Sequence, residues 1–265
     1  MTTILICFTL LWLLWASLVE WVRRAAVRPD DLRSGVVVRT MHLIARVVHR
    51  LRVTGREHIP PAPGRGAPPI VVVANHTAFI DPLLIQSALP FEVRWIMAAD
   101  MASPRFSRFW DFARVILVDR RVNESAPLRE AIKHLKAGGV IGVFPEGFIE
   151  RPPRTLFPFK EGVGLLVSRS GARVLPVIIE GTPQLDDGSR ALFTPSRSTL
   201  RVLPAIDYSA RILGPAEIAA DLRRVFLNAT GWPTSDRIPR WEHDHWVDIA
   251  LDGTELIRAP QPGPH

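Results

Sequence analysis

The pattern of apolar and polar positions divides the chain into a helical N-terminal part and a longer part in which strands and helices alternate. Residues 4–19 form an apolar run without a single charge. A helix that crosses a bilayer needs about 20 apolar residues, so this run is a borderline membrane span. Residues 34–51 repeat apolar side chains at spacings of four and three, with basic side chains on the opposite face. That pattern is typical of a helix lying in a membrane interface, and an ordinary helix packed on the domain is the alternative.

A proline- and glycine-rich stretch within residues 53–69, PPAPGRGAPP, predicts a linker or surface loop. Beyond it, short apolar runs alternate with helical patterns, which predicts a layered α/β domain with a mixed, largely parallel sheet flanked by helices. We expect strands at 70–74, 93–98, 115–118, 140–144, 174–179 and 199–203, and helices at 82–89, 125–135, 162–170 and 216–227.

Four segments follow from this pattern. Residues 1–52 form a membrane-associated two-helix anchor, 53–69 a linker, 70–230 the main domain and 231–265 a C-terminal tail whose structure the pattern does not predict. The tail contains Glu242 and His245 on either side of another His-Asp pair, which are potential metal ligands. Adjacent residues do not share one helix face, so a solvated turn is favoured and we expect no metal site.

Positive charge is concentrated behind the apolar run. The stretch from Trp21 to Arg65 has ten arginines, no lysine and three acidic residues, so it carries the whole formal charge of +7. Such a segment favours contact with anionic lipid headgroups, and the positive-inside tendency predicts that the main domain lies on the cytoplasmic side of the cell membrane. Nucleic acid is the other usual partner of a basic protein, but zinc-finger spacing and aromatic RNA-binding signatures are missing from the sequence. Cys7 is the one cysteine of the sequence, so an intramolecular disulfide cannot form. Its apolar setting also makes it a poor nucleophile.

The first candidate for chemistry is the heptapeptide NHTAFID at residues 75–81, directly after the apolar run 70–74. Open α/β sheets place their sites where strands end. Asp81 precedes a proline, which is favoured at the first helical position, so we expect Asp81 to cap a helix. If a turn brings Asp81 to His76, the carboxylate can accept the Nδ1 proton and leave Nε2 as a general base for a substrate hydroxyl. The alternative is that Asp81 only caps the helix and His76 only completes the turn.

Three further motifs follow other expected strands. The turn FPEG at 144–147 should expose the carboxylate of Glu146 to an acceptor hydroxyl, while Gly147 lets the backbone approach a ligand. Arg120 follows the strand at 115–118, and arginine suits bidentate contact with phosphate. Lys160, in a Phe-Lys-Glu-Gly segment, and the Leu-Pro-Val at 175–177 are weaker signals. Taken singly, each has the alternative of an ordinary turn or a solvated strand end.

Together and in this order, the four motifs resemble those of the 1-acylglycerol-3-phosphate acyltransferase family, also called the glycerolipid acyltransferase superfamily. The resemblance covers roughly residues 70–182. It implies that His76 and Asp81 are the catalytic pair and that Arg120 binds an acceptor phosphate. The remaining substrate-binding residues that it implies are Asn75, Glu146, Gly147 and Lys160. The chain departs from the family in having Ala78 where serine is common, and Phe-Ile-Glu after FPEG in place of Thr-Arg-Ser, with Arg151 two places late.

The resemblance also implies an activity. It is the transfer of a fatty acyl group from acyl-CoA or acyl-carrier protein to the hydroxyl of a lysophospholipid-type acceptor, at a membrane and without a metal or bound cofactor. We expect 1-acylglycerol-3-phosphate as the acceptor, giving phosphatidic acid, with glycerol phosphate or another lysolipid as alternatives. A catalytically inactive lipid-binding protein is the alternative from another class. The Gly-x-Ser-x-Gly elbow of serine hydrolases and the phosphate-binding loop of nucleotide hydrolases are both missing from the sequence.

Overall fold

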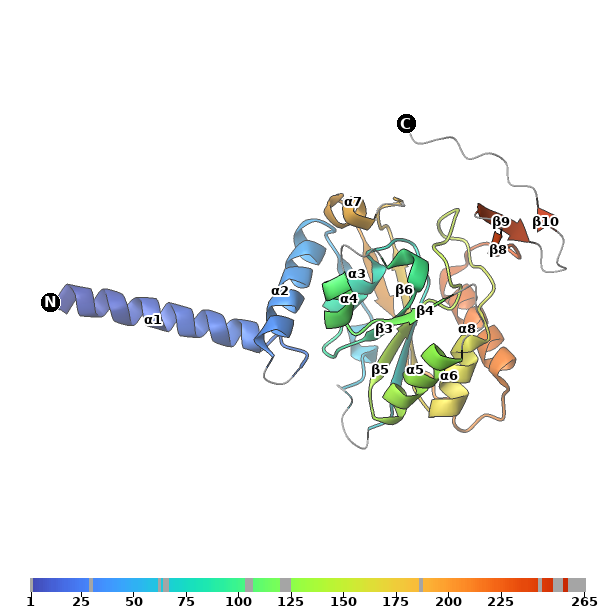
Figure 1. The fold of residues 1–265 in the computed structure, drawn as a ribbon, viewed down its shortest axis with the longest axis horizontal. Coiled ribbons are helices and arrows are strands. Elements are labelled where there is room, and N and C mark those ends of the chain that lie inside the picture. Colours follow the sequence, from blue (N-terminus) through green and yellow to red (C-terminus); the bar gives the residue numbers. More distant parts are fainter. Residues whose placement is uncertain are drawn as a thin grey trace.

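A seven-stranded sheet forms the centre of the protein, as Figure 1 shows for the computed structural model. The strand order is β1-β7-β6-β2-β5-β3-β4, and every neighbouring pair is parallel except β6 with β7. The strands are β1 (Arg52–Thr54), β2 (Ile70–Ala74), β3 (Arg94–Ala98), β4 (Ile116–Val118), β5 (Val140–Val143), β6 (Arg173–Glu180) and β7 (Thr199–Val202). The expected α/β fold with a mixed, largely parallel sheet is confirmed. The structure describes residues 2–28, 31–61, 63, 67–102, 107–119, 125–185, 188–242, 245–249 and 255–256.

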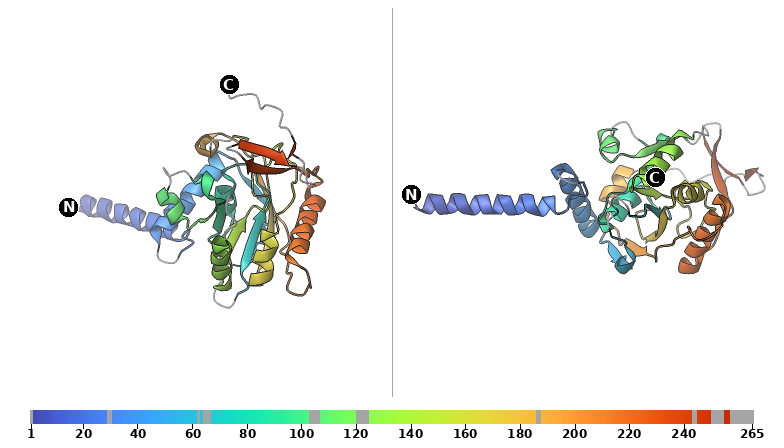
Figure 2. Two further views of the ribbon diagram at one scale, coloured as in Figure 1. Left: turned by 45° about the vertical axis from the view of Figure 1, so that its right-hand side comes forward. Right: turned by 90° about the horizontal axis from the view of Figure 1, so that it is seen from below.

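Helices cover both faces of this sheet (Figure 2). Strand β2 is buried along its whole length, and its alternate side chains enter two separate cores, which explains its unbroken apolar sequence. One core includes residues of α2 (Leu32–Val47), α3 (Asp81–Ala88) and α7 (Gly188–Phe193), and the other includes residues of α5 (Ala126–Lys136), α6 (Gly162–Ser170) and α8 (Pro215–Thr230). The remaining short helices are η1 (Arg56–His58), η2 (Ala99–Met101) and α4 (Ser107–Phe112).

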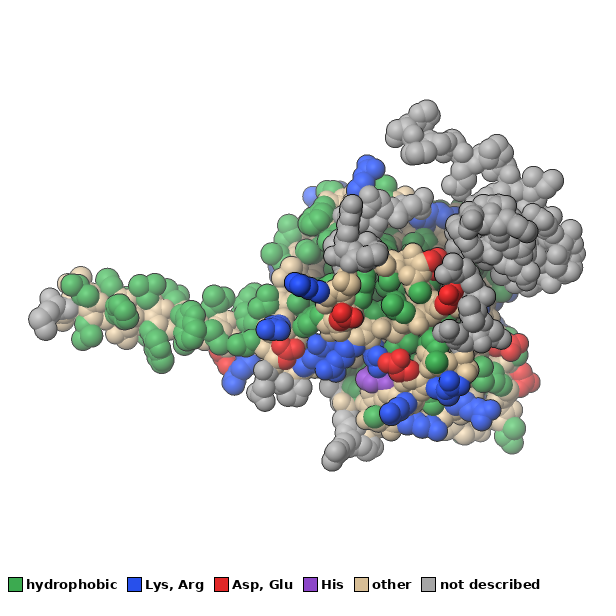
Figure 3. Space-filling model, viewed as in Figure 1, with side chains coloured by type: hydrophobic (Ala, Val, Ile, Leu, Met, Phe, Trp, Pro, Cys, Tyr) green, Lys and Arg blue, Asp and Glu red, His purple; other side chains and the backbone are tan. Residues whose placement is uncertain are grey.

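Helix α1 (Thr2–Arg23) projects away from the domain, with no buried residue. It is longer than the expected run 4–19, and among the described residues it is the one helix long and apolar enough to cross a membrane. Figure 3 shows hydrophobic side chains along its whole length. Its C-terminal end is joined closely to α2: a Cβ on Gly35 would lie 2.4 Å from the carbonyl oxygen of Val22. The Arg39 guanidinium donates to the Trp21 carbonyl at 2.7 Å and lies over the Trp21 ring.

The link between α1 and α2 is also held against the domain. Arg28 donates from Nε to Glu92 at 2.8 Å and from Nη2 to the Phe112 carbonyl at 2.6 Å, and its guanidinium lies over the Phe112 ring. These partners are distant in sequence and belong to the domain, so Arg28 holds the link against the part of the chain that carries the sheet.

Helix α2 packs on the domain with part of its surface, and another apolar part stays exposed. Val38 and Ala45 are buried against the domain, whereas apolar side chains on another face, including those of Val36, Leu43 and Val47, are exposed. The helix ends at Val47, earlier than expected, and the chain turns at Arg50 with a φ of 44°. His49 belongs to the range 34–51, whose basic side chains were expected on one exposed face, but it is fully buried, and that part of the prediction is wrong.

Two other segments differ from the expected boundaries. Strand β1 lies before residue 70, within and next to the segment expected as a linker, and pairs in parallel with β7 at the edge of the sheet. In the C-terminal tail, β8 (Ile238–Glu242), β9 (His245–Ile249) and β10 (Glu255–Leu256) form a separate antiparallel sheet. The side chains of the Glu242–His245 segment lie outside what the structure describes.

Candidate active site

The segments that follow β2, β5 and β6 meet at one edge of the sheet. Strand β2 lies between β5 and β6 and runs parallel to both, so the carboxyl ends of all three strands point the same way. This edge therefore gathers residues 75–81 after β2, 144–151 after β5 and 181–184 after β6. The candidate residues on these three segments are brought together by the sheet, although they are up to about a hundred positions apart in the sequence.

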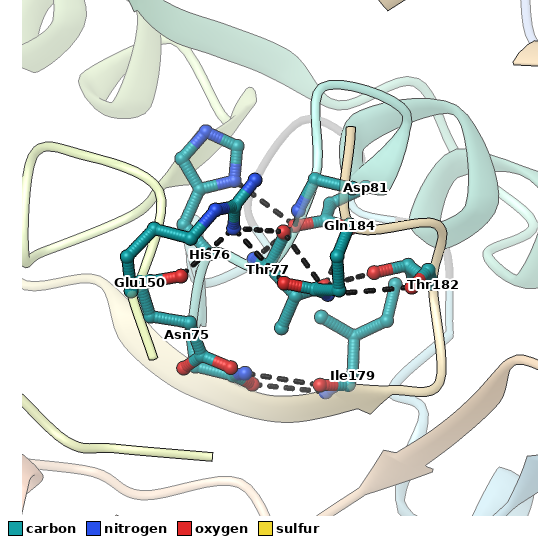
Figure 4. Close-up of polar contacts among 10 residues, drawn as sticks. Asn75, His76, Thr77, Asp81, Glu150, Ile179, Thr182 and Gln184 are labelled. Carbon is teal, nitrogen blue, oxygen red and sulfur yellow. Dashed lines mark hydrogen bonds and ion pairs between the residues drawn. The ribbon is translucent and has the colours of Figure 1, made fainter. Parts of the chain in front are cut away.

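The central contact is between His76 and Asp81. Nδ1 of His76 lies 2.9 Å from Oδ2 of Asp81, and the carboxylate is completely buried (Figure 4). The same oxygen accepts from the amides of Thr77 at 2.6 Å and Ala78 at 2.8 Å, and Oδ1 accepts from the Thr77 hydroxyl at 3.0 Å. Four donors thus compensate the desolvation of one buried negative charge. Asp81 was predicted to cap the following helix, but it is the first residue of α3 and its carboxylate turns back to the 76–78 turn.

This contact fixes the tautomer of His76. A carboxylate can only accept, so Nδ1 carries the hydrogen and Nε2 carries the lone pair. In Figure 4 the other ring nitrogen points away from the carboxylate and its partners. The imidazole stacks on Phe144, with ring centroids 4.0 Å apart, and Phe144 stacks in turn on Trp95 at 5.0 Å. Gly142 makes this stack possible, because a Cβ there would lie 2.6 Å from the Trp95 ring.

Asn75, expected to bind substrate, has a different place. Its side chain is fully buried, and its amide donates to the Ile179 carbonyl and accepts from the Ile179 amide, both at 2.9 Å. The side chain thus continues the pairing of β2 with β6 beyond the end of β2, as Figure 4 shows. Because both polar ends of the amide are engaged with the Ile179 backbone, the described contacts give Asn75 a structural role, and its contact with substrate stays a prediction.

Glu146 is also not where the turn pattern placed it. The FPEG segment does form a turn, closed by the Gly147 amide on the Phe144 carbonyl at 3.1 Å, but the Glu146 carboxylate is fully buried instead of exposed. It accepts weakly from the Phe157 amide at 3.3 Å, and Oε1 lacks a hydrogen-bond partner. Burial, with Glu150 nearby, raises the pKa of Glu146 well above its usual value. The expectation of an exposed carboxylate is therefore wrong.

Gly147 and Lys160 do lie together at this turn. Gly147 has a φ of +80°, which favours glycine, and a Cβ there would be 2.6 Å from Nζ of Lys160. The backbone amide of Lys160 donates to the Pro145 carbonyl at 2.9 Å, which holds the lysine against the turn while its side chain stays exposed. The Lys160 ammonium group thus lies beside the backbone of the FPEG turn. Phe144 of the same turn stacks on the His76 ring.

Glu150 is a buried residue of the site that the sequence gave no reason to select. Its amide donates to the His76 carbonyl at 2.7 Å, and one carboxylate oxygen accepts from the Arg154 amide at 2.9 Å while the other is unpartnered. Burial raises the pKa of Glu150 to about 7, and the Asp81 charge adds to this effect. A buried carboxyl group with such a pKa is mostly protonated under mildly acidic conditions.

Replacing Glu150 by glutamine is expected to change how stability depends on pH. Between the ordinary glutamate pKa of 4.5 and about 7, the folded protein keeps a proton that the unfolded chain has released, so rising pH destabilises the wild type. This one group lowers the free energy of unfolding by about 3 kcal/mol across that window. Glu150→Gln should therefore match the wild type below pH 4.5 and exceed it near pH 8, as measured by denaturant unfolding.

The exposed Glu161 supplies the control, because Glu161→Gln should follow the wild-type stability curve at every pH. Parallel curves for Glu150→Gln and the wild type would contradict a carboxyl group that is protonated only in the folded state.

Arg151, which the sequence showed displaced from its usual family position, lies at the 76–78 turn. Its Nη1 donates to the Thr77 carbonyl at 3.1 Å and to Oε1 of Gln184 at 3.0 Å, so it joins the segments after β2, β5 and β6. Gln184 and Thr182 are further residues of the site that the sequence did not select.

Arg120 lies outside the described residues, and β4, the strand before it, ends at the same edge of the sheet. Among the residues that the structure describes, no group of three or more His, Cys, Asp or Glu is arranged to hold a metal ion.

Comparison with known proteins finds similar chains. The family model Acyltransferase matches residues 50–180. A 1-acyl-sn-glycerol-3-phosphate acyltransferase of Borreliella burgdorferi is 32% identical over 137 residues, covering 50% of this chain and 52% of the relative. An N-acylphosphatidylethanolamine synthase of Arabidopsis thaliana is 26% identical over 153 residues, covering 51% of this chain and 54% of the relative. The chain thus spans about half the length of these curated relatives.

A solved structure extends the likeness over more of the chain. The crystal structure of the 1-acyl-sn-glycerophosphate (LPA) acyltransferase from Thermotoga maritima matches with a TM-score of 0.60 and 26% identity, covering 76% of this chain and 82% of that one. The region matched by the family model includes β2, the buried His76–Asp81 contact and the FPEG turn. On the strength of that region and of the shared fold, the chain belongs to the acyltransferase family that includes the 1-acylglycerol-3-phosphate acyltransferases.

Proposed function

We propose that the protein transfers a fatty acyl group from a thioester donor to the hydroxyl of a lysophospholipid-type acceptor. The observation that carries this proposal is the His76–Asp81 contact of 2.9 Å, in which the buried carboxylate holds the imidazole with Nε2 turned away from it. An imidazole held in this tautomer is a general base for an incoming hydroxyl, and the nucleophile is supplied by the substrate instead of by the protein.

The reaction has two steps. Nε2 of His76 takes the proton of the acceptor hydroxyl while the oxygen attacks the carbonyl carbon of the thioester. The imidazolium that forms is stabilised by the negative charge of Asp81. The tetrahedral intermediate then collapses, the carbon–sulfur bond breaks, and the departing sulfur receives the proton from His76. The products are an ester and a free thiol, and the base is restored without a metal or bound cofactor.

We infer 1-acylglycerol-3-phosphate as the acceptor and phosphatidic acid as the product. The names of the Borreliella and Thermotoga relatives support this choice, as does the cation of Lys160 beside the FPEG turn. The donor is acyl-CoA or acyl-carrier protein.

This function can be tested by incubating the detergent-solubilised protein with each donor and a panel of acceptors, including glycerol phosphate and lysolipids with other headgroups. Mass spectrometry then identifies the products. A new acyl ester is expected. Binding of lysolipid without any product would identify a catalytically inactive lipid-binding protein.

Replacing Arg120 by glutamine is expected to raise the KM for a phosphorylated acceptor by about tenfold and to leave the KM for the acyl donor nearly unchanged, because guanidinium binds phosphate through charge-assisted hydrogen bonds. Arg173→Gln is the matched control, since Arg173 begins β6 at the opposite edge of the sheet. Initial rates at varied acceptor and varied donor would measure both constants. Equal increases in the two would remove the role of Arg120 in acceptor recognition.

We also propose that α1 attaches the protein to the cell membrane, with the main domain on the cytoplasmic side. The exposed apolar surface of α1 supports this attachment, and the arginines at and after its C-terminal end, Arg23, Arg24 and Arg28, support this orientation. The exposed apolar side chains of Val36, Leu43 and Val47 on α2 add a surface suited to the same lipid interface.

Deleting residues 2–24 is expected to convert the protein from one that needs detergent for extraction to one that alkaline carbonate or high salt removes from membranes. Removal of α1 takes away the single candidate span of the described chain, whereas α2 and its buried residues stay in place. Sedimentation of membranes followed by immunoblotting measures the outcome. A truncated protein that still resists carbonate would show that another surface inserts into the bilayer.

A further inference from the structure

The hydrogen bonds around Asp81 continue into the segment that follows β6. The Thr77 hydroxyl lies 3.0 Å from Oδ1 of Asp81 and 2.5 Å from the hydroxyl of Thr182 (Figure 4). All three side chains are buried, with exposed fractions of 0% for Asp81, 2% for Thr77 and 5% for Thr182. An ionised carboxylate only accepts, so the one hydroxyl proton of Thr77 is donated to Asp81, and the proton in the second contact is donated by Thr182. The hydrogen bonds therefore run in one direction, from Thr182 through Thr77 to Asp81.

We propose that Thr182 is a positioning residue for the catalytic pair, acting on His76 through Thr77 and Asp81. This proposal rests on the acyl transfer proposed above. The Asp81 carboxylate receives three donors on Oδ2, one of which is Nδ1 of His76, and a single side-chain donor on Oδ1. Thr182 holds that single donor in the rotamer that faces Oδ1. The carboxylate plane, and with it the direction of the His76 ring, is thereby fixed from the side opposite the imidazole.

The backbone around Thr182 is itself held in place. Gly181 has a φ of +70°, and a Cβ there would lie 2.4 Å from the Arg197 carbonyl oxygen, so the chain passes closely against the segment before β7. The Ser198 hydroxyl can donate its one hydrogen to the Gly181 carbonyl at 3.3 Å or to the Ser196 hydroxyl at 2.9 Å, and the Ser196 hydroxyl lies 2.9 Å from Nδ1 of His49. Thr182 is thus presented by a buried polar network that reaches the end of α2.

The buried imidazole at the outer end of this network is fully satisfied. Nε2 of His49 contacts the Leu192 carbonyl at 3.1 Å, so it carries the hydrogen, and Nδ1 accepts from Ser196. Burial lowers the pKa of His49, which keeps the ring neutral in this arrangement. The neighbouring polar groups thus support the backbone at Gly181, and among the described residues the polar contact of the Thr182 side chain is the one with Thr77.

Three variants of Thr182 separate the hydroxyl from the packing of the side chain. Thr182→Ser keeps the donor and loses the methyl, Thr182→Val keeps the volume and loses the donor, and Thr182→Ala loses both. We expect kcat to fall about tenfold in Thr182→Val and Thr182→Ala, equivalent to about 1.4 kcal/mol of barrier, and by less than about twofold in Thr182→Ser. The KM values for acceptor and donor should stay within about twofold in all three, because the side chain is 5% exposed and is proposed to act through Thr77. Thr194→Ala should behave as the wild type, because the Thr194 hydroxyl donates to the Arg190 carbonyl in the adjacent α7.

A second measurement does not need turnover. Proton NMR of protein with labelled histidine reports the Nδ1 hydrogen of His76, assigned by its loss in His76→Gln. Its resonance should shift and exchange faster with solvent in Thr182→Val, and remain in place in Thr182→Ser. An unchanged resonance in Thr182→Val, or equal kcat values for Thr182→Val and Thr182→Ser, overturns the positioning role. A wild-type protein that shows the resonance but transfers no acyl group instead refutes the proposed function and leaves the positioning of the imidazole measurable.

Discussion

Replacing His76 by alanine is expected to lower kcat for acyl transfer by at least about 10²-fold, the size usual for loss of a positioned general base. Without the imidazole, the acceptor hydroxyl must attack as a neutral alcohol, and the departing thiolate lacks a proton donor. The fold should survive, because Asp81 keeps its three other donors, from the amides of Thr77 and Ala78 and from the Thr77 hydroxyl. Product mass gives the rate, and thermal unfolding reports the fold.

His58 provides the matched control for this variant. It lies in η1, is half-buried, and its one acidic neighbour, Glu57, is 3.8 Å away. His58→Ala should retain most of the activity of the wild type. Near-normal turnover in His76→Ala, with His58→Ala unchanged, would reject general-base catalysis by the His76–Asp81 pair.

Replacing Asp81 by asparagine is expected to lower kcat by about 10²- to 10⁴-fold while retaining most of the fold. The carboxamide oxygen can take the place of Oδ2 and accept from His76 and the two turn amides. The carboxamide nitrogen then faces the Thr77 hydroxyl, which can rotate and accept. What disappears is the negative charge that stabilises the imidazolium in the transition state, so the loss should fall on kcat more than on KM.

Asp81→Ala separates this charge effect from the structural role of the side chain. It removes every acceptor from the Thr77 and Ala78 amides, so it should also reduce the melting temperature, which Asp81→Asn should change much less. If Asp81→Asn kept wild-type kcat, the carboxylate would be needed only to shape the turn.

The central strands could be predicted from the sequence because they are buried on both faces. The five residues of β2 are all apolar, and such a run has few other structural interpretations. Strand β1 was missed because it has three residues at a sheet edge, with a partly exposed pattern that has no distinctive hydrophobicity. His49 was misplaced because periodicity cannot show that α2 stops at Val47. From that residue on, the chain turns inward and the helical face no longer applies.

The contact between His76 and Asp81 could be predicted because both residues lie in one short motif and the turn that joins them is local. The partners of that pair could not, because Thr182 and Gln184 are more than a hundred positions away from Thr77 and reach it only through the pairing of β2 with β6. The burial of Glu146 was also beyond the sequence, since a Pro-Glu-Gly turn usually exposes its carboxylate. Whether a turn is exposed depends on what later segments cover it, here Phe157 and its neighbours.

Arg28 and Arg39 hold the junction between the apolar N-terminal helix and the domain in one arrangement. The Arg28 guanidinium donates to Glu92 and the Phe112 carbonyl, and the Arg39 guanidinium donates to the Trp21 carbonyl. These contacts restrict the angle between the helix axis and the central sheet. With that helix inserted in a bilayer, the domain would not rotate freely as it would on a flexible linker. The domain would face the lipids in a single orientation, and every acceptor diffusing in the plane of the bilayer would approach the same side of the molecule.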